Sequence, residues 1–256
     1  MLRTELRKLL PYRTVWVILV LFAVLFVGFV SAGSSFTVNG QRMGDTLYAF
    51  PELWPRLAYV AHYFTLLLGI LLIILITDEF QFRTFRQQVI DGRSVGDLLV
   101  AKFAVSVGLV LFGVLVVLAA GVYFGLIRGA QAPASGAVTA QLPAVALYAV
   151  QTLGYLGLAA LLAVLVRRSG AAILLFLLYV WVAEPLLRYL LLPDVIDQYM
   201  PTKVLGALTP TPGQEMLTSM VGASGDLLPS QALPIALAYT AVFWGLSYLL
   251  LRNRDL

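Results

Sequence analysis

The stretch DEFQFRTFRQQVIDGRSVGDLLVAK, residues 78–102, separates two long apolar runs. It holds four of the chain's 17 Lys and Arg residues and four of its 13 Asp and Glu residues. The flanking runs, residues 57–77 and 103–127, each contain more than twenty residues without a formal charge. A helix that crosses the hydrocarbon core of a membrane needs about 20 residues at about 1.5 Å each. The charged stretch therefore connects two predicted membrane spans.

The composition of the whole chain supports a membrane protein. Hydrophobic residues make up 61% and charged residues 12%, whereas ordinary soluble domains have about 45–50% and about 25%. The net charge of +4 does not indicate nucleic-acid binding, because the basic residues form short clusters beside apolar runs, as membrane-flanking charges do. The chain has no cysteine, which excludes disulfides, thiolate metal sites and cysteine nucleophiles.

Six apolar runs predict an all-α membrane protein. Strands of a membrane barrel would alternate in polarity over about 10 residues, and these runs do not. We expect one transmembrane domain, residues 1–256, with spans at about 14–32, 57–77, 99–127, 142–166, 170–192 and 230–251. With the N-terminus in the cytoplasm, 12 of the 17 Lys and Arg residues lie inside. The positive-inside rule therefore predicts that both termini are cytoplasmic.

Two further segments predict short helices. Leu2, Leu6, Leu9 and Leu10 share one helical face, which predicts an N-terminal interfacial helix that Pro11 ends; a frayed basic tail is the alternative. Residues 193–226 contain four prolines and apolar stretches too short to span. We expect this external segment to form short re-entrant or capping helices before the sixth span.

The charged stretch itself is patterned as a short amphipathic helix. Apolar residues within positions 82–89 recur at spacings of three and four. Gly92 predicts the end of that helix, and Ser94 with Asp97 predicts a capping box for the next one. A helix lying on lipid accounts for the apolar face and the arginines, but anionic headgroups repel the acids. Mixed charge favours docking onto a cytoplasmic protein.

The same residues carry a resemblance to a known family. They fit the pattern E-x-x-x-x-T-x-R-Q-x-x-x-D-G-x-S followed by a Lys, at Glu79, Thr84, Arg86, Gln87, Asp91, Gly92, Ser94 and Lys102. The N-terminal R-x-E-L-x-K-L, the six-span plan and the final LLLRNRDL agree with it. The chain thus resembles the permease subunits of bacterial ABC transporters of the type-2 membrane class, which have the type-V exporter fold.

That resemblance implies a coupling helix between spans two and three that inserts into a separate cytoplasmic ABC ATPase subunit. The implied ATPase interface comprises Glu79, Phe82, Arg83, Thr84, Phe85, Arg86, Gln87, Val89, Asp91 and Gly92. It also implies a second permease subunit, in a homodimer or a heterodimer, within the lipid bilayer of the bacterial cytoplasmic (inner) membrane.

The chain is not expected to be an enzyme or to bind a cofactor or metal. A P-loop requires a lysine directly after a glycine, and none of Lys8, Lys102 and Lys203 follows one. ATP and magnesium are therefore expected on the partner ATPase.

The fifth apolar run is interrupted by Glu184, Pro185 and Arg188. Charges within a span are costly and suggest function, while the i, i+4 spacing lets Glu184 and Arg188 pair. Pro185 should kink or end the helix. The resemblance implies an external gate here, and a structural ion pair that anchors the helix end is equally expected.

Isolated polar residues give weaker signals. His62, the only histidine, cannot form a zinc site alone and is interpreted as a polar interfacial residue. Gln151 and Thr152 in the fourth span either line a permeation path or form hydrogen bonds between helices.

The leading hypothesis is the transmembrane permease subunit of an ATP-driven exporter. One alternative is an ion-driven secondary transporter, which needs ionisable groups near mid-membrane; only Glu184 and Arg188 qualify. A non-transporting membrane scaffold is the other alternative.

Overall fold

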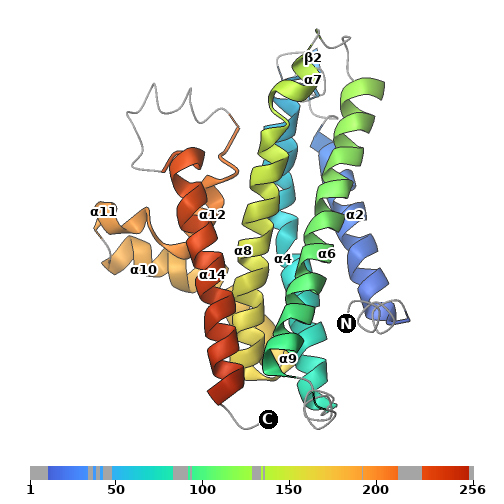
Figure 1. The fold of residues 1–256 in the computed structure, drawn as a ribbon. Coiled ribbons are helices and arrows are strands. Elements are labelled where there is room, and N and C mark those ends of the chain that lie inside the picture. The colour runs from blue at the N-terminus through green and yellow to red at the C-terminus, as the bar shows by residue number, and fades with distance from the viewer. Residues whose placement is uncertain are drawn as a thin grey trace.

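Within the residues that the structure describes, six helices are long and apolar enough to cross a membrane (Figure 1). The structure is a computed structural model, and it describes residues 11–33, 37–38, 41–42, 48–82, 92, 94–128, 134, 136–191, 193–212 and 227–253. The elements are α2 (Arg13–Gly33), β1 (Thr37–Val38), β2 (Gln41–Arg42), α4 (Leu53–Gln81), α6 (Val95–Val122), the π-helix η1 (Tyr123–Ile127), α7 (Ala137–Ala140), α8 (Pro143–Val166), α9 (Ser169–Leu178), the π-helix η2 (Tyr179–Ala183), α10 (Glu184–Leu191), α11 (Asp194–Asp197), α12 (Pro201–Ala207) and α14 (Pro229–Asn253).

The six predicted apolar runs are confirmed as helices, and the second is longer than the apolar run that predicts it. α4 continues through Asp78 and Glu79 to Gln81. The helix does not have to stop at these acids because both have partners: Tyr12 donates to Asp78, and Lys102 pairs with Glu79. The orientation of the helices in a membrane and the single-domain assignment stay predictions.

Helix α8 lies at the centre of the bundle. It contacts α4, α6, α9, α12 and α14, and most side chains of its C-terminal half are buried. The close approach of α12 depends on Gly154 of α8, because a Cβ atom at this position would collide with the side chain of Leu205. Small residues allow such backbone approach within membrane bundles.

The fifth helix, predicted over residues 170–192, bends along its length. It passes from α9 through the π-helix η2 into α10, and α10 runs across the direction of the long helices (Figure 1). Pro185 has no amide hydrogen to donate within the helix and crowds the preceding turn, and π-helical turns accompany such bends. The prediction of a kink or end at Pro185 is therefore confirmed, and the helical stretch Ser169–Leu190 is still long and apolar enough to count as one candidate membrane span.

Short helices lie before the last long helix, as predicted. α11 follows α10, and α12 returns to pack against α8 and α14 (Figure 1). The capping box predicted for α6 is also confirmed: the Asp97 amide donates to Ser94 Oγ at 3.1 Å, and the Ser94 amide donates to Asp97 Oδ2 at 3.3 Å. Gly92 has a φ of 87°, a left-handed conformation that glycine adopts without strain. The predicted N-terminal helix and the body of the predicted coupling helix lie outside the described residues.

Candidate functional site

A buried ion pair joins α4 and α6, the two helices that flank the charged connector (residues 82–94). Lys102 Nζ of α6 lies 2.8 Å from Glu79 Oε1 of α4, and the two side chains are 6% and 11% exposed. Burial makes such a pair sensitive, because loss of one partner leaves an uncompensated charge away from water. The pair therefore fixes the end of α4 relative to the start of α6, on both sides of the connector.

The position of Glu79 changes its interpretation. This residue belongs to the predicted ATPase interface, but its side chain faces inward to Lys102. It can position the connector, and it does not present its carboxylate to a docking protein in this structure. The sequence pattern already contained both partners, because Glu79 is its first residue and Lys102 is the lysine that follows it.

A second contact fixes the end of α4 against the turn between α8 and α9. The guanidinium of Arg167 lies over the ring of Phe80, 5.0 Å from its centroid. Arg167 caps α8 with a φ of 57°, and its amide donates to the Ala163 carbonyl at 2.9 Å. A cation stacked on an aromatic face contributes about 0.5–1 kcal/mol at an exposed site and more when it is desolvated.

A third contact ties α2 to the same end. The hydroxyl of Tyr12, just before α2, donates to Asp78 Oδ2 at 2.6 Å. This hydrogen bond to a carboxylate raises the pKa of Tyr12 above its usual 10.0, because the phenol must keep its proton to donate.

The connector is described only at its two ends. Phe82 is 74% exposed directly after α4, and Gly92 precedes the cap of α6. The predicted interface residues that lie outside the described residues are Arg83, Thr84, Phe85, Arg86, Gln87, Val89 and Asp91. Their assignment to an ATPase interface stays a prediction.

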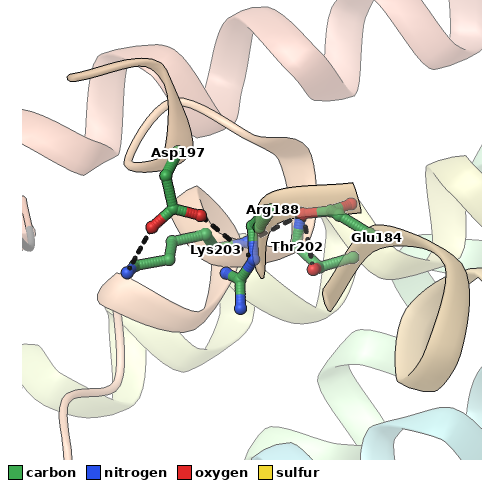
Figure 2. A network of polar contacts seen from close by, with 5 residues as sticks. All are labelled: Glu184, Arg188, Asp197, Thr202 and Lys203. Atoms are coloured by element: carbon green, nitrogen blue, oxygen red, sulfur yellow. Dashed lines mark hydrogen bonds and ion pairs between the residues drawn. The ribbon is translucent and has the colours of Figure 1, made fainter. Parts of the chain in front are cut away.

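The second candidate site is a polar network at the bend of the fifth helix (Figure 2). Glu184 is fully buried, and its Oε1 accepts hydrogen bonds from the Thr202 amide at 2.7 Å, the Thr202 hydroxyl at 2.6 Å and the Lys203 amide at 3.2 Å. These amides belong to the first turn of α12, which has no capping side chain of its own. Glu184 thus caps α12 from a distant part of the chain, where a negative charge is favourable.

The predicted ion pair between Glu184 and Arg188 is wrong. Arg188 Nε lies 3.3 Å from Asp197 Oδ1, and Lys203 Nζ lies 2.9 Å from Asp197 Oδ2 (Figure 2). The i, i+4 spacing allowed the pair, but Glu184 Oε1 accepts from the first turn of α12 instead, while Arg188 pairs with Asp197. In this conformation the network anchors α10, α11 and α12 to one another, and the predicted role of this region as a gate stays a prediction.

Three members of the network, Asp197, Thr202 and Lys203, were not identified from the sequence. They follow Glu184 by 13 to 19 positions, with Asp197 on α11 and the other two on α12. Pro201 marks the start of α12, but no sequence periodicity indicates that this helix start meets Glu184.

His62 belongs to a separate chain of hydrogen bonds within the bundle. Its Nδ1 lies 2.8 Å from Gln151 Nε2, and the Thr209 hydroxyl donates to Gln151 Oε1 at 3.0 Å. His62 thus joins α4 to α8, and its position at the membrane interface stays a prediction. Thr152 lies 3.4 Å from the Thr65 hydroxyl, so for Gln151 and Thr152 the structure favours hydrogen bonds between helices.

Comparison with known proteins places the chain in a family without an assigned function. A family model described as a protein of unknown function (DUF2705) matches residues 14–256, and the chain belongs to that family. No curated protein matches the chain.

Proposed function

We propose that this DUF2705 chain is the transmembrane permease subunit of an ATP-driven exporter, with ATP hydrolysis on a separate cytoplasmic ABC ATPase. The observation that carries the proposal is the buried Glu79–Lys102 pair at the two ends of the connector. It comes in addition to the six-helix plan and the sequence pattern around the connector.

Fixed ends are what a force-transmitting connector needs. If the ends of the connector could move freely, a partner could displace the connector without moving the helices. Here the end of α4 contacts α6 through Lys102, the α8–α9 turn through Arg167, and the start of α2 through Tyr12. Displacement of the connector would therefore move the cytoplasmic ends of several helices together, because packed interiors transmit strain.

The proposed assembly contains two permease subunits and two ATPases in the bacterial cytoplasmic membrane, with both permease termini inside. ATP and magnesium would bind the ATPases. In the proposed cycle, closure of the ATPases displaces the connector, and the permeases then change the side of the membrane to which their shared pathway opens.

Co-purification with the ATPase encoded beside the chain tests this proposal. Phe82→Asp with Gly92→Pro should abolish retention of the ATPase, because one change places a charge on the exposed ring position and the other removes the left-handed turn. The matched control is Ile127→Asp with Gly136→Pro, which changes a 70% exposed apolar residue and a glycine with φ of 83° in another loop. Equal retention by both double variants would refute a coupling role for the connector.

The ion-driven transporter has weaker support than the exporter. It requires an ionisable group that is free to exchange an ion near mid-membrane. Glu184 caps α12 and Arg188 pairs with Asp197, so both candidates have structural roles in this conformation.

A further inference from the structure

A cavity of about 460 Å³ lies between the bent fifth helix and the centre of the bundle. Its walls come from α4, α8, η2, α10 and α12, and from the segment that follows α12. The volume is within the range of about 300–1,000 Å³ that small-molecule sites occupy. Three residues of the polar network described above, Arg188, Thr202 and Lys203, line this cavity.

One wall of the cavity is aromatic. The rings of His62 and Tyr155 have centroids 5.4 Å apart, and His62 and Tyr63 are 5.1 Å apart. Tyr59 stands edge-on to Tyr63 at 5.4 Å, and Trp181 from η2 joins the lining. Flat, weakly polar surfaces of this kind suit the apolar body of a ligand.

The lining also carries positive charge. Arg188 and Lys203 line the cavity, whereas their acidic partner Asp197 and the buried Glu184 do not. Among the residues that the structure describes, the lining contains no carboxylate. The network is balanced in charge, but it presents only its cations to this space.

The terminal nitrogens of the Arg188 guanidinium face away from the neighbouring carboxylates. Its ion pair with Asp197 uses Nε, and Figure 2 shows the two terminal nitrogens of the guanidinium pointing away from both Asp197 and Glu184. A guanidinium fork binds carboxylate and phosphate oxygens through two parallel hydrogen bonds. A cationic ligand would be repelled by the same lining.

We propose that this cavity binds one anionic amphiphile, with its carboxylate or phosphate on Arg188 and its apolar body against Tyr63, Tyr155 and Trp181. The shared chemistry is an anionic head on an apolar chain, which a free fatty acid or a membrane phospholipid can supply. The proposal does not rest on the exporter function, because binding can be measured on the chain without an ATPase.

Native mass spectrometry of the full chain in a neutral detergent tests the proposal. The probes are oleate against methyl oleate, and dioleoyl phosphatidate against dioleoylglycerol, which lacks the phosphate. We expect one saturable adduct with at least one anionic probe, held about ten-fold or more tightly than its neutral counterpart, since hydrogen bonds to charged groups contribute about 1.5–3 kcal/mol. The anion that binds better distinguishes a fatty acid from a phospholipid.

Two variants assign the adduct to this cavity. Arg188→Gln should weaken anion binding about ten-fold, while Arg128→Gln, a change of an exposed arginine outside the lining, should not. Gly206→Leu places a side chain in the cavity without removing a charge, and a Cβ at Gly206 meets no atom within 4 Å. It should abolish the adduct, whereas Gly245→Leu, which also enters open space but lies outside the lining, should retain it.

Several outcomes would overturn the proposal. They are equal binding of anionic and neutral probes, an unchanged adduct in both Arg188→Gln and Gly206→Leu, and the absence of any saturable adduct. If Arg188→Gln does not fold, Gly206→Leu against Gly245→Leu decides the question alone.

Discussion

Thr202 donates from both its backbone amide and its hydroxyl to the same oxygen of Glu184, at 2.7 and 2.6 Å. The acceptor lies at the bend of the fifth helix and the donors lie in the first turn of α12. A buried carboxylate at this place is tolerated because a helix start supplies its hydrogen bonds.

We predict that Thr202→Val destabilises the chain by about 1–3 kcal/mol, because the buried charged oxygen loses one donor. Thermal unfolding in detergent measures the effect as a lower Tm. Thr240→Val is the matched control: its hydroxyl is also buried but bonds to the Ala236 carbonyl of its own helix. An equal fall in Tm for both variants would show that the Glu184 contact contributes nothing special.

The Glu79–Lys102 pair predicts strong non-additivity. Glu79→Leu and Lys102→Met should each cost about 3–5 kcal/mol, because each leaves a buried charge without its partner. The double variant should recover most of that loss, since well-packed apolar residues often replace a buried pair at little cost. A double-mutant cycle on thermal unfolding measures the coupling, and additive losses would contradict the prediction.

The proposed role of this pair adds a second readout. In the proposed complex with an ABC ATPase, the stable double variant should retain the ATPase but couple hydrolysis to transport less well. Removal of the ion pair loosens the connector ends without changing the docking surface.

Tyr12 predicts a pH dependence at the alkaline end only. Its pKa is raised by the hydrogen bond to Asp78, so the bond's contribution is fully present below pH 10 and is lost as the pH rises through the raised value. Tyr12→Phe should lower Tm slightly and equally at pH 7 and pH 9. The wild type should converge on the variant only above pH 10, and convergence near neutral pH would refute this assignment.

The contact between α8 and α12 at Gly154 can be tested by adding a side chain there. Gly154→Ala should destabilise the chain by about 1–3 kcal/mol, because the added methyl group meets Leu205. Adding Leu205→Ala should relieve that collision, so the two changes should combine to less than the sum of their separate costs. Gly108→Ala is the control, since a Cβ there meets no atom within 4 Å. It should be neutral or slightly stabilising by helix propensity.

Local signals predicted much of this fold. The apolar runs, the cap formed by Ser94 and Asp97, and the bend at Pro185 each depend on residues within one or two turns of each other. For that reason composition, spacing and backbone chemistry were sufficient to place them.

Contacts between distant segments could not be predicted in the same way. The i, i+4 spacing made Arg188 the natural partner of Glu184, because the amides of Thr202 and Lys203 meet it only after α12 has returned to the bundle. His62 likewise has no polar partner near it in sequence, and its contact with Gln151 depends on the packing of α4 against α8. The pairing of Glu79 with Lys102 brings together two residues of one motif, of which only Glu79 was assigned to the predicted ATPase interface.

The polar network also has an electrical property. Glu184 and Asp197 carry the same number of formal charges as Arg188 and Lys203, so their sum is zero. Moving one elementary charge across a membrane potential of 100 mV involves about 2.3 kcal/mol. A displacement of these four side chains together along the membrane normal carries no net charge, and the resting voltage of the cell does no net work on it.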